Sequence, residues 1–224
     1  MSQPAVDKIS DINLIETMAA ELNHDLSNPL MVFSNVLELI ECDDFECTKQ
    51  ELKEHVKTMT VAANRLNIHI RTLAHFNSHS VRFKKDSVLK MIKKAVSHAS
   101  ISNSIQVHLP VEDVTIDMDA AQLETAIIIL VTSAAQAMNN KGDIFLRLSE
   151  CDEDVTLIVE DNGDGIPLEL LPRLFEPTYL NRKIGPCLGL PACKRIIENH
   201  RGEITVRSTP FGTVFSLKLL KTIR

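Results

Sequence analysis

Apolar residues recur at steps of three and four through the first third of the chain, and they form two stripes. This spacing keeps apolar side chains on one face of a helix, so it predicts a helix over about residues 11–42 and a second one along the stripe from residue 52 to residue 76. The stripe of the first helix consists of Ile15, Ala19, Leu22, Leu26, Leu30, Phe33, Leu37 and Ile40. The stripe of the second consists of Leu52, Val56, Met59, Ala63, Leu66, Ile70, Leu73 and Phe76.

A short acidic turn at residues 42–47 separates the two stripes. Thr48 and Glu51 then have the spacing of a capping box, in which a hydroxyl and a carboxylate bind the free amides at the start of a helix. Two long helices joined by a short turn predict an antiparallel hairpin. Because one hairpin cannot cover its own apolar stripe, we expect two copies to form a homodimeric four-helix bundle.

After about residue 80 the pattern changes to short strands mixed with helices. Alternating apolar residues predict strands near residues 105–109, 114–118, 143–149, 154–160, 203–207 and 213–219. Helices are expected near 87–98, 119–138 and 188–199, with Asp119 as an N-cap. Together these elements predict an α+β chain: a helical hairpin in residues 1–80, a polar hinge near 78–86, and an α/β sandwich in residues 81–224 with helices on one sheet face.

The composition limits the classes of function. The 224 residues carry a formal net charge of -6, which argues against nucleic acid as a partner. The apolar stretch at residues 126–138 is too short and too interrupted to span a membrane, and no leader sequence is visible, so we expect a soluble cytoplasmic protein whose signal comes from a separate sensor protein. The five cysteines form no C-x-x-C pair, which is typical of free thiols in a reducing compartment.

The first candidate site lies on the first predicted helix, in the string from Asn23 to Leu30. His24 falls opposite the apolar stripe, with Asn28 one turn later on the same face and Pro29 bending the helix just beyond. A neutral imidazole is a nucleophile, and a neighbouring carboxylate such as Asp25 can orient it and take its proton. A lone histidine in this setting is most often an ordinary surface residue, so the motif needs support from the rest of the chain.

The second candidate site is the string from Asp161 to Pro167, directly after a predicted strand. The carboxylate of Asp161 can accept the exocyclic amine of adenine, and Gly163 and Gly165 allow the backbone to approach a ligand without a Cβ clash. By itself the string is equally consistent with a pair of Asn-Gly and Asp-Gly turns.

Read together, the motifs resemble those of two-component sensor histidine kinases along residues 11–220. The string around His24 resembles the H-box of these proteins, and four further motifs follow in the family's order: Asp161–Gly165, Leu174–Pro177, Gly185–Leu190 and Gly212–Thr213. The resemblance implies a dimerising phosphotransfer hairpin followed by a GHKL-type (Bergerat) ATPase domain. It also implies that His24 is phosphorylated, that Asp25 is its acid/base helper, and that Asn28 positions water for dephosphorylating a response regulator.

The resemblance further implies that ATP and Mg²⁺ are the cofactors and that a response-regulator receiver domain is a partner. The nucleotide-binding residues carried over by the motifs are Asp161, Gly163, Gly165, Gly185, Leu188, Gly189 and Thr213. The phosphate and metal region departs from the family pattern. Both asparagines of the family's N-x-x-x-N-A-x-x-A helix are replaced, by Ile129 and by Ser133, which is left as a weak candidate ligand for Mg²⁺. In the second glycine box, Cys187 replaces a glycine and Pro186 removes an amide donor.

Three functions follow from these observations. The first is a protein-histidine kinase that phosphorylates itself from ATP, passes the phosphoryl group to an aspartate of a response regulator, and has phosphatase activity through Asn28. The second is a histidine phosphotransferase of a phosphorelay, whose ATPase domain has lost or weakened nucleotide binding; the replaced asparagines favour it. The third is a GHKL-type module that clamps a partner without kinase activity, and the motif around His24 argues against it.

Overall fold

The structure is a computed structural model, and it describes residues 23–24, 26–41, 48–77, 80–99, 101–139, 141–176 and 189–223. The chain divides into two compact units, residues 1–69 and residues 70–224, which we describe separately. The last turns of the second helix therefore group with the second unit. The functional boundary expected near residue 80 stays a prediction.

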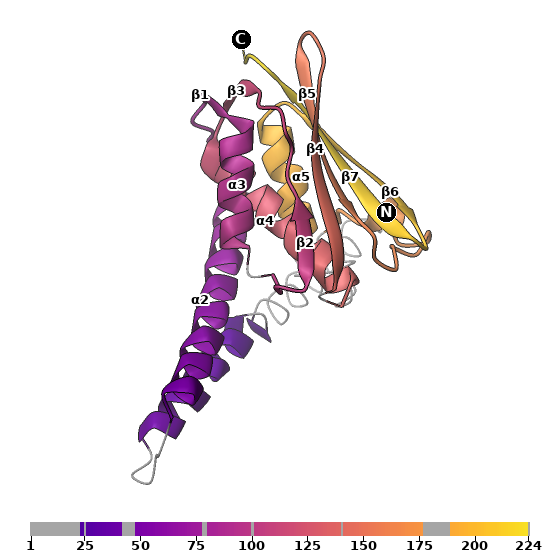
Figure 1. Cartoon of the computed structure of the whole chain (residues 1–224). Helices are drawn as coiled ribbons and strands as arrows, with labels where there is room; N and C mark the ends of the chain where they lie inside the picture. Colours follow the sequence, from indigo (N-terminus) through magenta and orange to yellow (C-terminus); the bar gives the residue numbers. More distant parts are fainter. Residues whose placement is uncertain are drawn as a thin grey trace, which may run out of the picture. The chain divides into compact units, whose positions relative to one another are not determined.

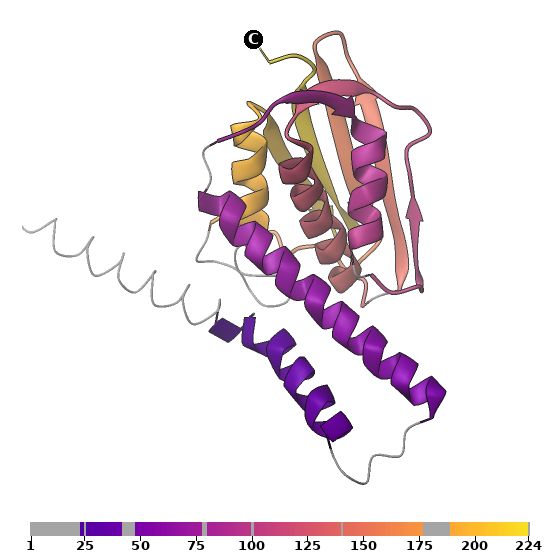
Figure 2. The same cartoon turned by 90° about the vertical axis from the view of Figure 1, so that its left-hand side faces the viewer.

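The first unit is helical. One helix covers residues 26–41 and is followed by α2 (Lys49–Asn77), which runs alongside it in the opposite direction (Figures 1 and 2). The predicted capping box at the start of α2 is present: the Glu51 amide donates to Thr48 Oγ1 at 3.3 Å, and the Thr48 amide donates to Glu51 Oε2 at 2.8 Å. The predicted turn at residues 42–47 lies outside the described residues.

Much of the predicted apolar stripe is exposed in this single chain. The buried apolar residues of this unit include Val36 and Ala62, which are not part of the predicted stripes. Six residues of the stripes are among the large exposed apolar side chains: Leu30, Leu37, Ile40, Leu52, Val56 and Ile70. A stripe of this kind is what a second copy would cover. The dimeric four-helix bundle stays a prediction.

The second unit contains a five-stranded sheet with the strand order β2-β4-β5-β7-β6. Its strands are β2 (Ile105–His108), β4 (Gly142–Glu150), β5 (Asp154–Asp161), β6 (Glu203–Thr209) and β7 (Gly212–Leu220). Strands β2 and β4 pair in parallel, and the other neighbours pair antiparallel. A short 3₁₀ helix (Leu171–Arg173) follows the loop after β5.

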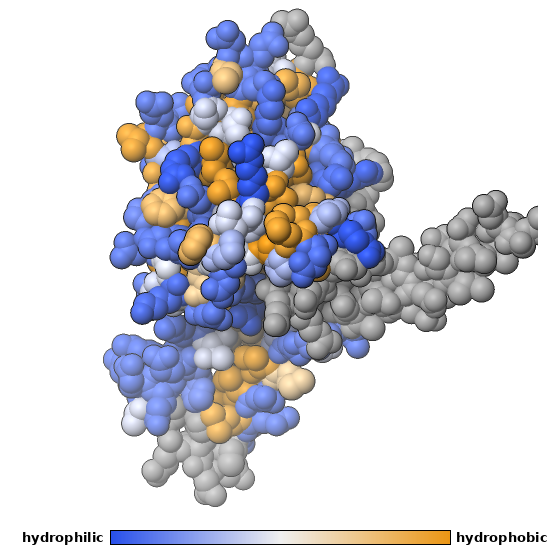
Figure 3. Space-filling model, turned by 90° about the vertical axis from the view of Figure 1, so that its right-hand side faces the viewer, coloured by the Kyte–Doolittle hydropathy of each residue, from blue (hydrophilic) through white to orange (hydrophobic). Residues whose placement is uncertain are grey.

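Helices cover one face of this sheet, as the sequence predicted. The covering helices are α3 (Val88–His98), α4 (Ala120–Ala137) and α5 (Gly189–Asn199), with α4 contacting both of the others (Figure 2). Residues of β5 alternate between buried and half-buried, which places Val155, Leu157 and Val159 under the helices. The surface seen from the right-hand side of Figure 1, where the sheet lies, carries hydrophilic residues mixed with apolar ones (Figure 3).

Helix α4 is the core of the unit. It has the length and hydropathy of a membrane span, but 72% of it is buried among the other elements. Its buried carboxylate, Glu124, binds Lys94 Nζ and His98 Nδ1, each at 2.8 Å, and Arg71 Nη1 at 3.2 Å. Burial favours a higher pKa for Glu124, but these three basic partners outweigh it and hold the pKa below its usual value.

The prediction that residues 78–86 are a polar hinge is wrong for its last part. Strand β1 (Lys84–Ser87) pairs antiparallel with β3 (Thr115–Met118) to form a separate two-stranded sheet. The sequence did not predict β1, because its side chains are hydrophilic and none of its residues is fully buried. Its partner strand also lies far away in the sequence. Ser87 ends β1 and also caps α3, since its Oγ accepts the Lys90 amide at 2.9 Å.

The start of α4 depends on two side chains. Asp119 is its N-cap, as predicted, and Asp119 Oδ1 accepts the Gln122 amide at 3.2 Å. The amide of Asp119 itself donates to His200 Nε2 at 3.0 Å, while His200 Nδ1 donates to the Ile196 carbonyl at 2.7 Å. This arrangement requires a neutral ring, and burial lowers the pKa of His200.

The neutral state of His200 predicts how stability depends on pH. As the pH falls below 6.5, the unfolded chain binds a proton at this residue and the folded chain does not, so the free energy of unfolding should fall. Denaturant unfolding of His200→Gln should show a smaller decrease in the free energy of unfolding between about pH 7 and about pH 5 than that of the unchanged protein. His200→Ala should lower the free energy of unfolding by about 2 kcal/mol, because it leaves a buried amide without a partner. The exposed His108→Gln serves as the control, and equal pH slopes for both glutamine variants would contradict the account.

Candidate nucleotide-binding site

The site is centred on Asp161, the last residue of β5. Its side chain lies on the buried face of the sheet, where Oδ1 accepts the Gly163 amide at 2.9 Å and the Thr213 amide at 3.3 Å. Its other oxygen, Oδ2, makes no hydrogen bond with the residues that the structure describes. The carboxylate is therefore fixed in orientation while one oxygen stays available to a ligand. Burial raises the pKa of Asp161, Glu160 adds to that rise, and the two amides oppose it.

Two glycines allow the chain to close around this carboxylate. Gly165 has a φ of +73°, and a Cβ at this position would lie 1.9 Å from the carbonyl oxygen of Thr209. Gly212 has a φ of +144°, and a Cβ there would lie 2.0 Å from the carbonyl oxygen of Asp161. Both conformations strongly favour glycine, so the loop after β5 and the turn between β6 and β7 meet without side chains between them.

Ser208 supports this loop, and the sequence analysis did not identify it. Its hydroxyl accepts the Ile166 amide at 2.7 Å and lies 3.0 Å from Thr213 Oγ1. Ser208 and Thr213 are directly paired residues of β6 and β7, so only the strand register brings them together. Thr213, whose amide binds Asp161, thus has its side chain held by a partner that carries no motif of its own.

The C-terminal end of α4 closes another side of the site. A Cβ on Gly163 would lie 3.1 Å from the carbonyl oxygen of Ala137, so the loop after β5 packs against the last turn of α4. Ser133 lies one turn earlier on the same helix, and its buried Oγ has no hydrogen-bond partner among the described residues. The neighbouring Thr132 Oγ1 is buried without a partner as well. Ile129, by contrast, is fully inside the apolar core.

The described residues offer little to a metal ion. They contain no group of three His, Cys, Asp or Glu side chains that could hold one. Mg²⁺ at a nucleotide site often takes only one or two protein ligands and fills the remaining positions with phosphate and water oxygens. The unpartnered hydroxyl of Ser133 is compatible with one such ligand, and Gln136 is exposed on α4.

Part of the predicted site lies outside the described residues. This applies to Gly185 and Leu188, as well as to Pro186 and Cys187, the two residues at which the second glycine box departs from the family pattern. Gly189 is described, and it begins α5 as a buried residue. The structure therefore brings together Asp161, Gly163, Gly165 and Thr213 of the predicted nucleotide-binding residues.

The predicted phosphoacceptor His24 belongs to the first unit. Its side chain is exposed, and Asn28, one turn later, places its amide nitrogen 3.2 Å from Nε2 and 3.4 Å from Nδ1. The amide can donate to whichever ring nitrogen is unprotonated. Asp25 lies outside the described residues. The chemical roles of His24, Asp25 and Asn28 stay predictions.

Known proteins are similar to this chain over most of its length. Residues 118–223 match the family of histidine kinase-, DNA gyrase B- and HSP90-like ATPases. The sensor protein KdpD of Clostridium acetobutylicum is 28% identical over 94% of this chain, and sporulation kinase E of Bacillus subtilis is 26% identical over 95%. The alginate biosynthesis sensor protein KinB of Pseudomonas aeruginosa is 30% identical over 84%. These alignments cover 25%, 29% and 34% of the relatives, so the chain spans about a quarter to a third of their length.

Solved structures of histidine kinases are also similar to this chain. The catalytic domain of histidine kinase ThkA, in a nucleotide-free form, matches with a TM-score of 0.57 and 26% identity, over 64% of this chain and 99% of that domain. In the complex of ThkA with the response regulator protein TrrA, a chain matches with a TM-score of 0.62 and 21% identity, over 95% of this chain and 64% of that one. The second match shows a shared fold.

The geometry at Asp161 predicts the effect of removing its charge. Asp161→Asn keeps the shape of the side chain but exchanges an acceptor for an amide donor that faces the ligand. ATP affinity measured by isothermal titration calorimetry should fall roughly tenfold to a hundredfold, as expected for a lost hydrogen bond to a charged group. In the unchanged protein, affinity should also weaken on acidification at a pH above the ordinary aspartate pKa of 3.8, because the raised pKa protonates Asp161 early. Asp164→Asn, an exposed change in the same loop, is the control, and an equal loss in both variants would contradict this account.

Proposed function

We propose that this chain is an ATP-dependent protein-histidine kinase of a two-component system, because residues 118–223 match the histidine kinase-, DNA gyrase B- and HSP90-like ATPases and most of the chain is similar to sensor and sporulation kinases. The observation that carries the proposal is the buried carboxylate of Asp161, fixed through one oxygen by two backbone amides and available through the other. Such a carboxylate suits the exocyclic amine of adenine, which donates to Oδ2. Thr213, held by Ser208, lines the same place.

The phosphoryl acceptor in this proposal is His24. One neutral ring nitrogen forms a bond to the γ-phosphorus of ATP, the bond from that phosphorus to the β–γ bridging oxygen breaks, and ADP leaves. Asp25 orients the ring through its other nitrogen and takes up the proton that the ring gives off. The exposure of His24 supports the role, because a donor and later a receiver domain must both reach it.

The metal that accompanies ATP would neutralise phosphate charge when bound. On this chain Ser133 is the candidate to hold it, through its buried and otherwise unpartnered hydroxyl. Because a neutral hydroxyl is a poor ligand compared with a side-chain carbonyl, we expect a weak dependence of nucleotide affinity on Mg²⁺.

The partners follow from the same proposal. The exposed apolar stripe of the helical unit would pair with a second copy, giving a homodimer. The phosphoryl group would pass from His24 to an aspartate of a response-regulator receiver domain, which the complex of the similar protein ThkA with TrrA supports. Asn28, within hydrogen-bond reach of His24, would position water for the reverse, phosphatase reaction. A cytoplasmic location and a separate sensor protein complete this proposal.

A second candidate function is a histidine phosphotransferase without kinase activity. It is favoured by one specific observation: Ile129 is buried in the apolar core, and Ser133 offers a single hydroxyl where the kinases carry metal-binding amide side chains. In that case His24 would receive its phosphoryl group from a phosphorylated regulator.

Phosphorylation with γ-labelled ATP separates the two functions. The unchanged protein with Mg²⁺ should gain an acid-labile label, as expected for phosphohistidine, and His24→Gln should gain none. His55→Gln, a second histidine of the helical unit, is the matched control and should retain the label. If ATP gives no label but a phosphorylated receiver domain transfers label to His24, the protein is a phosphotransferase and the kinase proposal fails.

A second prediction concerns the replaced metal ligand. Ser133→Asn supplies a carbonyl oxygen where the hydroxyl now lies, so MgATP should bind roughly tenfold more tightly while affinity for ATP without Mg²⁺ stays the same. Titration calorimetry with and without Mg²⁺ measures both values. An unchanged affinity for MgATP would mean that the phosphates bind away from α4.

A further inference from the structure

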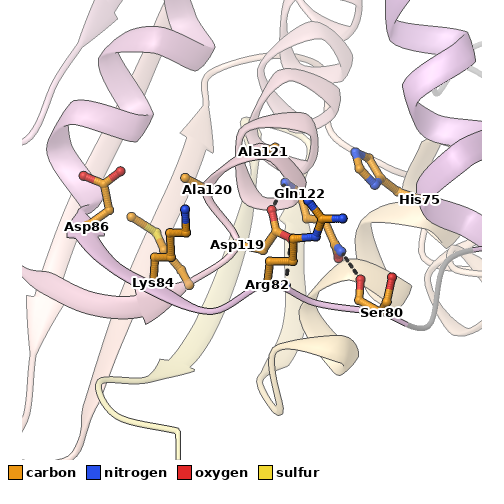
Figure 4. A pocket seen from close by; sticks show the side chains of 10 residues that line it. His75, Ser80, Arg82, Lys84, Asp86, Asp119, Ala120, Ala121 and Gln122 are labelled. Atoms are coloured by element: carbon orange, nitrogen blue, oxygen red, sulfur yellow. Dashed lines mark hydrogen bonds between the residues drawn. The ribbon is translucent and has the colours of Figure 1, made fainter.

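A cavity of about 440 Å³ lies at the N-terminal end of α4, and it belongs to the second unit alone. Its wall comes from the end of α2, the segment that leads into β1, β1 itself, the end of β3 and the first turn of α4 (Figure 4). It is separate from the nucleotide-binding site, because its deepest helix residue, Gln122, is roughly 16 Å along the helix axis from Ser133. A volume of this size suits a small molecule.

Two positive charges that pair with none of the described residues line this cavity. Arg82 and Lys84 project from neighbouring positions of the chain toward the first turn of α4 (Figure 4). Among the described residues, no carboxylate or carbonyl binds the guanidinium of Arg82 or the ammonium of Lys84. Exposed cations need no partner, but two of them on the wall of one cavity make a site for negative charge.

The two carboxylates in the same wall are already engaged. Asp119 uses both oxygens on backbone amides, those of Gln122 at 3.2 Å and of Arg82 at 3.1 Å. Asp86 is engaged through Oδ1 alone, which accepts the Ser87 amide at 2.9 Å and pairs with Lys90 at 3.6 Å. Among the charged groups of the wall, the capacity that no described residue engages is therefore that of the two cations and of one oxygen of Asp86.

Gln122 adds an independent requirement. Its side chain is 3% exposed and its Nε2 donates to the Ser80 carbonyl at 2.9 Å, but its buried Oε1 accepts no hydrogen bond from the part of the chain that the structure describes. A buried amide oxygen without a donor is costly, so a ligand with a hydroxyl or amino group would satisfy it. Burial also lowers the pKa of His75 in the same wall, which favours a neutral ring that offers a further donor or acceptor.

We propose that this cavity binds a small phosphomonoester that also carries a hydroxyl group. The phosphate lies between Arg82 and Lys84, both of which are common phosphate-binding residue types, and the hydroxyl donates to Gln122 Oε1. A bound molecule bridges the segment after α2 to the start of α4. The proposal stands independently of the kinase function, because it uses none of the residues around Asp161 or His24.

The test uses glycerol 3-phosphate as the probe, with glycerol and inorganic phosphate for comparison. Titration calorimetry of the whole chain should show binding of glycerol 3-phosphate, weaker binding of inorganic phosphate and none of glycerol. Arg82→Gln and Lys84→Gln should each weaken glycerol 3-phosphate binding about tenfold. Lys85→Gln, the next residue of β1 and not part of the cavity wall, is the matched control and should leave it unchanged.

A further variant separates the two parts of the ligand. Gln122→Met keeps the approximate volume but removes the acceptor, so glycerol 3-phosphate should bind less tightly while inorganic phosphate is unaffected; a thermal melt confirms that this variant folds. Asp161→Asn should leave glycerol 3-phosphate binding intact. Loss of binding in Asp161→Asn would place the probe in the nucleotide-binding site and overturn the proposal. Equal binding of glycerol 3-phosphate by Arg82→Gln and by the unchanged protein would also overturn the proposal. So would the absence of binding at about 10 mM glycerol 3-phosphate. In that case, binding of an acidic peptide would assign the two cations to a different class of ligand and would not rescue the proposal.

Discussion

The burial of α4 is the constraint on which the rest of the second unit depends. Because α4 is covered by two other helices and a sheet, each polar group on it that lacks a partner costs free energy. Side chains from distant segments supply partners for two of these groups: Glu124 is matched by three basic residues, and the Asp119 amide at the helix start is matched by His200. These contacts fix the position of α4 against the sheet, and thereby the position of both of its ends.

Toward each of its ends α4 carries buried polar atoms that have no partner among the described residues. Toward the C-terminal end these are the hydroxyls of Thr132 and of Ser133, which lies one turn before the residue that packs against the loop after β5. At the N-terminal end it is the side-chain oxygen of Gln122, a residue that lines the cavity together with Arg82 and Lys84. A single apolar helix thus reaches the candidate nucleotide-binding site near one end and the proposed phosphomonoester site at the other.

Much of the fold could be predicted from the sequence because the signals are local. The capping box at Thr48, the N-cap at Asp119 and the loop at Asp161 each consist of a few consecutive residues with a fixed physical role. Strand β1 could not be predicted, because its polar residues show no alternation and its pairing with β3 is non-local. For the same reason the roles of Ser208 and His200 could not be predicted. Each side chain binds a residue far away in the sequence, which strand register or helix packing brings close.

The central claim is that Asp161 holds the adenine of ATP through one oxygen while backbone amides fix the other. The most direct measurement is a ¹H–¹⁵N correlation spectrum of the labelled protein, titrated with ATP. The account predicts that the amide signals of Gly163 and Thr213, which donate to Asp161, are among the most strongly shifted. Saturable ATP binding that leaves both signals in place would contradict it.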